Sequence, residues 1–306
     1  MVDPNPDASR IALGLWPIAG ITTVGVTQSD ARATIATAID CGIRRFDTAF
    51  SYGYEGQCDR YLGEFITQQR DQFTILSKVG QRWSGDHQRV IDGSPQTLIT
   101  DAEESLRRIG TERFDCLMLH SPDPKIDIRV SAEAIESLQR RGLCDKIGVC
   151  NVTADQRRLF ASAASCDAIQ CPLNLLQRDA LSLLIPDCSA DDCEVFTFWT
   201  LMKGLLAGRI SRQHVFADND VRPTYPIFQG RARERAHNVV DKLSALGKTI
   251  NTTVAQLAVG WVLAQRGVTA ALVGARTPDQ IRELAASVPL RAETCDAIES
   301  IVQSQT

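Results

Sequence analysis

The chain has 306 residues, of which 44% are hydrophobic, and it carries a formal net charge of −4. This length fits one α/β barrel of about 250 residues with additions, or two domains of average size. Because acidic and basic residues are interspersed without a basic run, we expect neither nucleic acid nor an anionic membrane surface as a partner. A small molecule is the partner that this composition favours.

Residues 1–10 are polar, and no apolar run reaches the roughly 18 to 20 residues of a membrane span. We therefore expect a cytoplasmic protein without a signal peptide. The chain has ten cysteines, but none of them forms the paired CxxC motifs that bind zinc. Reduced thiols that pack as small hydrophobic side chains are the favoured interpretation, and we expect no metal site.

Eight apolar runs of strand length alternate with stretches of helix length along the chain. The runs predicted to be strands are residues 12–16, 44–49, 73–79, 115–120, 146–151, 167–172, 195–199 and 270–275. Such a repeat indicates parallel strands that are connected by crossover helices. Because every gap holds a candidate helix, we predict an α/β fold with a closed, parallel, eight-stranded barrel. This (β/α)8 or TIM barrel is expected to be a single domain over residues 1–306.

Start and stop signals mark several of the helices. We expect the first helix to begin after Ser29 and Asp30, either of which can cap it. The sequence predicts a second helix over 95–109, with a proline in its first turn and Gly110 after its end. A further helix is predicted over 131–141, directly before another glycine.

The longest stretch without periodicity covers residues 210–230. Its apolar residues Phe216, Tyr225, Ile227 and Phe228 favour a loop that packs against another part of the molecule over a disordered one. Long loops after the strands of such barrels frequently form lids or substrate walls. We expect this loop to be a wall of the substrate pocket.

Polar side chains that can transfer or orient protons follow three of the predicted strands. They are Asp47 and Tyr52 after the second strand, Lys78 at the end of the third, and His120 at the end of the fourth. The carboxyl ends of barrel strands form one rim, so we expect these side chains to meet. Taken singly, Asp47 with Lys78 could be a buried ion pair and His120 a core histidine. Their combination at neighbouring strand ends favours catalysis.

The sequence FDTAFSYG at residues 46–53, LSKVG at 76–80 and DCLMLHSP at 115–122 resembles the aldo-keto reductase family. Further motifs follow in the family order, namely GVCN (148–151), IQCPLN (169–174), FWTLMKGLLAGR (198–209) and residues 255–284. The resemblance therefore covers the chain from about Leu13 to Leu284. It implies a bacterial-type, NADP-dependent aldo/keto reductase that lacks the long C-terminal arm of the animal aldose reductases.

The resemblance implies catalytic roles for Asp47, Tyr52, Lys78 and His120. Tyr52 is expected to be the acid that protonates the carbonyl oxygen, and the Lys78 ammonium group to stabilise the phenolate that results. Asp47 would hold Lys78 in its charged form, and His120 would orient the carbonyl oxygen.

No GxGxxG motif follows a strand, so the resemblance implies a nucleotide that lies extended across the barrel mouth rather than on a Rossmann fold. Asn151 and Gln170 are expected to bind the nicotinamide carboxamide, Phe198 to stack on its ring, and Arg276 to contact adenine or a 2′-phosphate. The full set of expected cofactor-binding residues is Trp16, Asn151, Gln170, Phe198, Leu201, Lys203, Gly208, Gly274, Arg276, Gln280 and Glu283.

Three residues depart from the family pattern. Phe198 stands where a tyrosine is usual, Cys150 where a serine is usual, and Leu284 where an asparagine usually reads the adenine edge. The first change keeps a stacking ring, whereas the other two remove hydrogen bonds to the nucleotide. Trp16 is expected to line the substrate pocket as well, together with Tyr54 and Trp83.

The sequence thus predicts an NADPH-dependent reductase of aldehydes or ketones, reversible toward alcohol oxidation, with NADH as the alternative cofactor. Two other functions stay open on the same fold. One is a nucleotide-binding regulatory protein like the β subunits of voltage-gated potassium channels, and the other is an NAD-dependent sugar dehydrogenase. The sequence leaves the physiological carbonyl or sugar substrate, the direction of the reaction and the oligomeric state undetermined.

Overall fold

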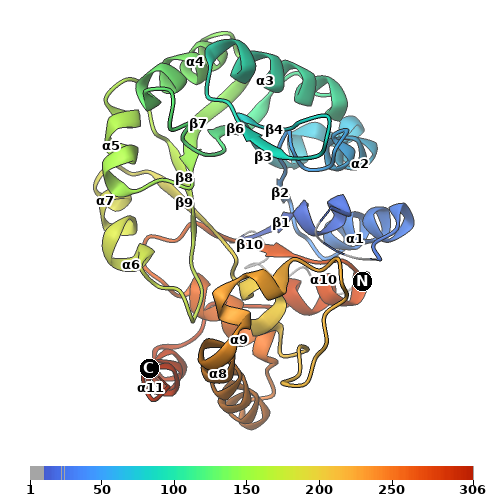
Figure 1. Ribbon diagram of the computed structural model, residues 1–306, viewed down its shortest axis with the longest axis vertical. Coiled ribbons are helices and arrows are strands. Elements are labelled where there is room, and N and C mark those ends of the chain that lie inside the picture. Colours follow the sequence, from blue (N-terminus) through green and yellow to red (C-terminus); the bar gives the residue numbers. More distant parts are fainter. Residues whose placement is uncertain (1–9, 22, 24, 306) are drawn as a thin grey trace.

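The computed structural model describes residues 10–21, 23 and 25–305, and helices surround a central barrel in it (Figure 1). Eight parallel strands close in the order β1-β10-β9-β8-β7-β6-β3-β2. Their bounds are β1 Ile11–Gly14, β2 Arg45–Asp47, β3 Thr74–Val79, β6 Phe114–Leu119, β7 Cys144–Cys150, β8 Ala168–Pro172, β9 Glu194–Phe198 and β10 Ala270–Gly274. The predicted TIM barrel is confirmed.

Helices occupy the connections between consecutive strands of the barrel, and two more follow the last strand. They are α1 Gln28–Asp40, α2 Gln57–Ile66, α3 Pro95–Ile109, α4 Ile128–Arg140, α5 Ala154–Ala161, α6 Ala180–Leu183, α7 Ile185–Ala190, α8 Gly230–Thr249, α9 Val254–Leu263, α10 Pro278–Ala285 and α11 Ala292–Gln303. The predicted bounds of α3 are confirmed, with Pro95 in its first turn and Gly110 in the left-handed conformation after its last residue.

Two predicted helix starts were wrong, and two predicted strands end earlier than expected, namely β1 and β2, the latter at Asp47 rather than at residue 49. The cap of α1 is Thr27, whose hydroxyl accepts from the Asp30 N–H while the Asp30 carboxylate accepts from the Thr27 N–H. This reciprocal pair starts the helix before Ser29. Asp127 caps α4, so that helix begins at Ile128 rather than at 131. β1 ends at Gly14, because residues 16–19 form a short 3-10 helix with proline in its first turn.

The barrel interior holds the apolar side chains of alternate strand residues. Members of this inner cluster are Ala12, Leu76, Cys116, Met118, Ala168, Phe196, Ala270 and Leu272. Side chains in a strand repeat every two residues, so the residue two positions after each inner one faces the same way. By this rule Lys78, His120, Gln170 and Phe198 point into the barrel at its carboxyl end. The intervening strand residues pack outward against the helices.

A short hairpin that was not predicted lies between β3 and α3. Its strands are β4 Gln81–Trp83 and β5 Arg89–Ile91, and they pair only with each other. In the turn the Ser84 N–H donates to the Gln88 carbonyl, and His87 adopts a left-handed φ of 62°. The hairpin stands above the carboxyl ends of the strands, on the face that carries the predicted site.

The loop over residues 210–230 is packed rather than disordered, as predicted, and it lies against residues 202–207 and α8. Phe228 is buried in a cluster with Leu205, Ile210 and Ala236, and Phe216 lies edge-on against Phe228 at 5.5 Å between ring centres. Its role as a substrate wall stays a prediction.

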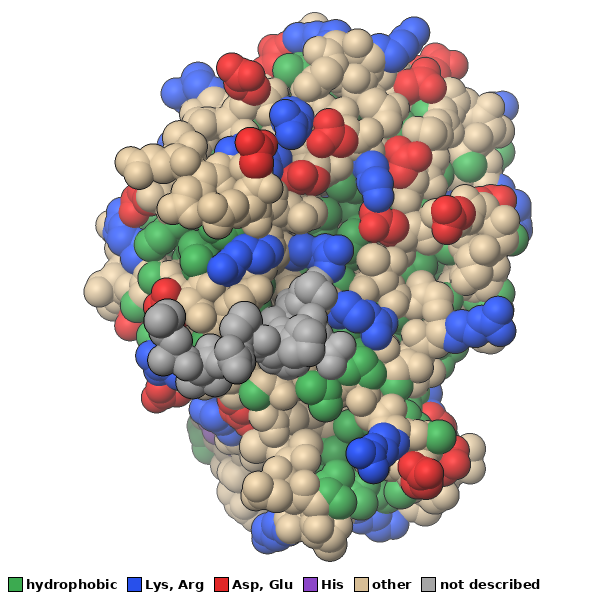
Figure 2. Space-filling view, turned by 180° about the vertical axis from the view of Figure 1, so that it is seen from behind, with side chains coloured by type: hydrophobic (Ala, Val, Ile, Leu, Met, Phe, Trp, Pro, Cys, Tyr) green, Lys and Arg blue, Asp and Glu red, His purple; other side chains and the backbone are tan. Residues whose placement is uncertain are grey.

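The distribution of surface charges and the state of the cysteines match what the composition led us to expect. On the face in Figure 2, basic and acidic side chains are interspersed, without a large patch of one charge. The ten cysteines, all of which lie in the described ranges, are free thiols. Among the described residues, no helix is both long and apolar enough to cross a membrane.

Candidate active site

The Lys78 ammonium group is the centre of the predicted catalytic cluster. Its Nζ donates to Asp47 Oδ1 at 2.6 Å, to the Thr48 carbonyl at 3.0 Å and to the Tyr52 hydroxyl at 3.2 Å. Lys78 is the penultimate residue of β3, Asp47 is the last residue of the neighbouring strand β2, and Thr48 follows it. The structure therefore brings three of the four predicted catalytic residues into one hydrogen-bonded chain.

The charges of this cluster are held inside the protein. Lys78 is 1% exposed and Asp47 is 2% exposed. Burial is the largest single effect and lowers the pKa of Lys78, but Asp47 together with the Tyr52 and Cys150 side chains outweighs it, so the net pKa of Lys78 is raised. Lys78 therefore stays protonated at neutral pH and faces the phenol as a cation.

Tyr52 is half-buried, and its pKa is raised above the ordinary value, mainly because burial disfavours the phenolate. The Lys78 ammonium group acts in the opposite direction, as predicted, but it does not overcome the effect of burial. The phenol therefore holds its proton firmly until negative charge develops close to its oxygen.

His120 completes the cluster directly after β6. Its ring centre lies 5.9 Å from that of Tyr52, and its Nδ1 is buried without a hydrogen-bond partner among the described residues. Burial, followed by the nearby charges of Lys78 and Arg89, lowers the pKa of His120 well below its usual value. The imidazole is therefore neutral and keeps one N–H with which to orient an oxygen atom.

The side-chain amides of Gln170 and Asn151 contact residues of this cluster. The Gln170 amide nitrogen donates to Asp47 Oδ1 at 2.6 Å, a contact that the sequence did not predict. The Asn151 amide nitrogen donates to the His120 carbonyl at 3.0 Å and to the Cys150 sulfur at 3.2 Å. Both amides are thus engaged within the protein, and their contact with a nicotinamide carboxamide stays a prediction.

Lys203 lies in a strained segment after β9. Its Nζ is 3.9 Å from the ring centres of both Trp199 and Tyr225. Lys203, Trp199 and Met202 all have left-handed φ values, between 42° and 56°, which non-glycine residues adopt only rarely. Burial, with a smaller contribution from Arg89, lowers the pKa of Lys203 to about 8. Its neighbour Phe198 is half-buried and packs on the inner cluster.

The residues predicted to bind the adenosine end lie around the N-terminus of α10. Gly274 is exposed, and the Arg276 N–H donates to Gln280 Oε1 at 2.9 Å. Thr277 caps the helix by accepting from the Gln280 N–H. Glu283 pairs with Arg209 at 2.5 Å. These contacts order the segment, and its binding of a nucleotide stays a prediction.

Three other positions have structural roles. Leu201 and Gly208 were expected to bind the cofactor, and Leu284 departs from the family pattern. Leu284 is 2% exposed in the outer core, so its side chain offers no polar contact to a ligand. Leu201 packs half-buried against the same core, and Gly208 has a φ of 70° at the end of a 3-10 helix over residues 202–207.

Aromatic side chains form one wall of the mouth. Trp16 packs edge-on against Tyr52 at 5.3 Å and stacks nearly parallel to Trp83 at 6.4 Å between ring centres. Tyr54 contacts Trp83 at 5.1 Å and stacks on His87 at 3.8 Å. The sequence predicted Trp16, Tyr54 and Trp83 for this wall but missed His87, which only the hairpin brings into place.

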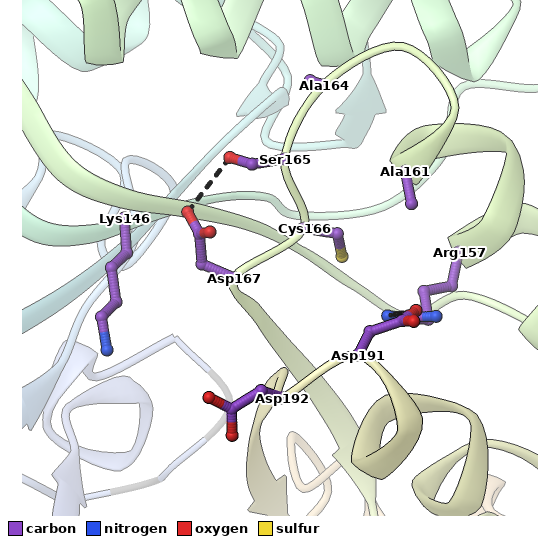
Figure 3. A pocket seen from close by; sticks show the side chains of 9 residues that line it. All are labelled: Lys146, Arg157, Ala161, Ala164, Ser165, Cys166, Asp167, Asp191 and Asp192. Atoms are coloured by element: carbon purple, nitrogen blue, oxygen red, sulfur yellow. Dashed lines mark hydrogen bonds and ion pairs between the residues drawn. The ribbon is translucent and has the colours of Figure 1, made fainter.

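A separate hollow of about 560 Å³ lies near the opposite end of the barrel (Figure 3). Its lining includes Lys146 in β7, Asp167 before β8, and Asp191 and Asp192 before β9. The buried Arg157 pairs there with Asp191 at 2.7 Å. Active sites of such barrels are built at the carboxyl ends of the strands, so we do not assign catalysis to this hollow.

Comparisons with known proteins find related proteins along nearly the whole chain. The Aldo/keto reductase family matches residues 10–303. The aldo-keto reductase YhdN of Bacillus subtilis is 32% identical over 287 residues, which cover 93% of this chain and 86% of that protein. The NADH-specific methylglyoxal reductase of Escherichia coli is 28% identical, over 94% of this chain and 92% of its own.

Among solved structures, the glycerol dehydrogenase AKR11B4 from Gluconobacter oxydans is similar with a TM-score of 0.88 and 30% identity. The match covers 97% of this chain and 92% of that chain. Family, fold and the geometry at the rim therefore point to the same conclusion. This chain belongs to the aldo/keto reductase family.

Proposed function

We propose that this protein reduces aldehyde or ketone groups with a reduced nicotinamide dinucleotide, reversibly toward alcohol oxidation. The observation that carries the proposal is the contact of Lys78 Nζ with both Asp47 and Tyr52, beside a neutral His120. This arrangement supplies a proton donor and an orienting group at one place on the rim. Membership of the family supports the same class of reaction.

The rim residues fit a nicotinamide nucleotide. Phe198 offers a half-exposed ring for stacking, and the exposed Gly274 lies at the carboxyl end of β10 on the same rim. Among the described residues no carboxylate pairs with Lys203, so its ammonium group is available for a phosphate. When bound there, the reduced nicotinamide would supply a hydride to the carbonyl carbon.

Side chains of the protein would then orient the carbonyl oxygen of the substrate and protonate it. His120 donates its N–H to the carbonyl oxygen and fixes its position near Tyr52. As negative charge builds on that oxygen, Tyr52 transfers its phenolic proton to it, and Lys78 stabilises the phenolate. Asp47, which Gln170 holds from the other side, keeps Lys78 charged and directed at the phenol.

We propose NADPH as the preferred cofactor, because Arg276 lies beside the N-terminus of α10, where a 2′-phosphate would be recognised. NADH is the alternative, and the name of the E. coli relative shows that an NADH-specific reductase occurs among similar proteins. Small aldehydes, ketones, polyols and sugars are the proposed substrate class. A glycerol dehydrogenase and a methylglyoxal reductase among the similar proteins support it.

The test follows the absorbance of NADPH and NADH with a panel of aldehydes, ketones and sugars. We expect turnover in the wild type, and a loss of roughly two or more orders of magnitude in Tyr52→Phe with nucleotide binding nearly unchanged. Tyr61→Phe, in the outward-packed helix α2, is the matched control and should keep its activity. Nucleotide binding without any turnover would instead support a regulatory, nucleotide-sensing protein.

A further inference from the structure

Arg89, at the start of β5, is a guanidinium at the rim without a carboxylate partner. It is exposed, and among the described residues no acidic side chain pairs with it. Arg82, on the other strand of the same hairpin, is paired with Asp101 at 2.6 Å. Because an arginine side chain stays charged at every relevant pH, Arg89 presents an uncompensated positive charge to the mouth of the barrel.

Two tryptophan rings fix the place of this charge. The Cζ atom of Arg89 lies 5.1 Å from the ring centre of Trp16 and 5.2 Å from that of Trp83. Arg89 and Trp83 are opposite each other in the hairpin register, so their side chains share one face. Stacking on aromatic rings uses the faces of a guanidinium and leaves its N–H edge for a ligand.

The Arg89 guanidinium lies next to the catalytic cluster. Trp16, on which Arg89 stacks, packs edge-on against Tyr52. The charge of Arg89 also acts on His120 and on Lys203, in each case after the larger effect of burial. The Asp47 carboxylate is buried and already paired with Lys78, so it does not compensate Arg89. The mouth of the barrel therefore favours a ligand with negative charge.

We propose that Arg89, which lies against both Trp16 and Trp83, is a subsite for a carboxylate or phosphate group on the carbonyl substrate. The subsite rests on the proposed reductase function and narrows its substrate class to carbonyl compounds that also carry an anionic group. A planar guanidinium can donate two parallel hydrogen bonds to the two oxygens of a carboxylate or of a phosphate. Such a contact would position the carbonyl group for Tyr52 and His120 while it remains outside the chemical step.

Two aldehydes of nearly equal shape test the subsite, namely 4-carboxybenzaldehyde and its neutral counterpart 4-carbamoylbenzaldehyde. In the wild type we expect kcat/KM to favour the acid. In Arg89→Ala this preference should fall by roughly tenfold or more, through a higher KM for the acid. Arg235→Ala on the outer helix α8 removes the same charge elsewhere and should leave the preference intact. An unchanged preference in Arg89→Ala would overturn the subsite.

A binding experiment separates the subsite from turnover. Benzoate and benzamide are titrated into the complex with oxidised nucleotide, with tryptophan fluorescence as the readout. Tighter binding of benzoate that is lost in Arg89→Ala supports the subsite, even if no aldehyde is reduced and the proposed reductase function fails. Equal binding of the two compounds to the wild type overturns the subsite. So does a weaker nucleotide affinity in Arg89→Ala with no effect on benzoate, which would assign the guanidinium to the phosphates of the cofactor.

Discussion

Lys78 keeps its charge in the interior because three oxygen atoms surround its ammonium group. Lys78→Met would leave the Asp47 carboxylate buried without its cationic partner, with only neutral groups such as the Gln170 amide beside it. Removal of one partner of a buried ion pair costs about 3 to 5 kcal/mol of unfolding free energy. We therefore expect both lower stability in urea and a loss of turnover by roughly two orders of magnitude.

The double variant Lys78→Met with Asp47→Asn is the control for this prediction. It removes both charges, so it should regain part of the lost stability without regaining activity. If Lys78→Met alone turned over at the wild-type rate near neutral pH, the proton donor would not depend on Lys78.

Lys203 makes nucleotide binding sensitive to pH. Its pKa is lowered to about 8 because burial disfavours the ammonium form. The charged form, which attracts phosphate, predominates below that value and is lost as the pH rises through it. We therefore expect the affinity for nucleotide to fall between about pH 7 and pH 9, as measured by fluorescence titration. Lys203→Arg should bind with little pH dependence over this range, since a guanidinium does not titrate there. If the nucleotide affinity of the wild type did not change over this pH range, Lys203 would not be a phosphate-binding residue.

Arg276 is the residue on which the proposed cofactor choice depends. A charge-assisted contact with a 2′-phosphate is worth about 1.5 to 3 kcal/mol, or roughly tenfold to a hundredfold in affinity. Arg276→Ala should therefore weaken the binding of NADPH by that factor and that of NADH much less. Arg282→Ala on the adjoining helix α10 is the matched control, because Arg282 is already paired with Asp279 at 2.8 Å. Equal losses for the two nucleotides would mean that Arg276 only stacks on adenine.

At the scale of the element, Gly63 shows how closely α2 approaches α3. A Cβ atom at this position would lie 2.3 Å from the Ile109 carbonyl oxygen. Helix propensity favours alanine over glycine by about 1 kcal/mol, but the clash with a fixed backbone atom outweighs this gain. We expect Gly63→Ala to lower the unfolding free energy by roughly 1 to 3 kcal/mol in a denaturant titration.

Gly85→Ala, in the turn of the hairpin, is the comparison for this measurement, because a Cβ there would meet nothing within 4 Å. It should leave the stability nearly unchanged. If Gly63→Ala were as stable as the wild type, α2 and α3 would be able to move apart at this contact without loss of unfolding free energy.

Strand periodicity made the barrel predictable, whereas local capping and short hairpins escaped prediction. The same alternation that buries Leu76 and Met118 directs Lys78 and His120 to the interior, so these two residues of the proposed site could be placed at the rim from the strand pattern. The contact between Gln170 and Asp47 could not, because it joins residues 123 positions apart across the closed barrel. Strands of three residues, such as Gln81–Trp83, are too short to give a periodic signal.

For the whole molecule, two buried carboxyl groups tie stability to pH. Asp59, which accepts from Thr48 and Ser105, and Asp101, which pairs with Arg82, both have a pKa raised to about 6, mainly by burial. Between about pH 4 and pH 6 the native state therefore binds more protons than the unfolded chain. The stability contributed by these protonated groups is fully present below about pH 4 and is lost as the pH rises through 6.

Asp59→Asn tests this linkage. Relative to the wild type, the unfolding free energy of the variant should rise by roughly 3 kcal/mol between pH 4 and pH 7, because the amide carries no charge to desolvate. Asp218→Asn in the exposed loop is the control and should show no such trend. Parallel pH profiles for wild type and Asp59→Asn would show that Asp59 does not titrate in this range.

The hairpin β4–β5 is a structural unit separate from the barrel. Its strands belong to no barrel ladder, and it is attached near its base by the ion pair of Arg82 with Asp101 and by the hydrogen bond from Trp83 to the Ser51 carbonyl. The hydrogen bonds that assemble Asp47, Tyr52 and Lys78 do not pass through it. Residues 84–91 could therefore be transplanted between related barrels as a cassette. Selectivity for a substrate and the capacity for catalysis can then evolve, or be engineered, independently of each other.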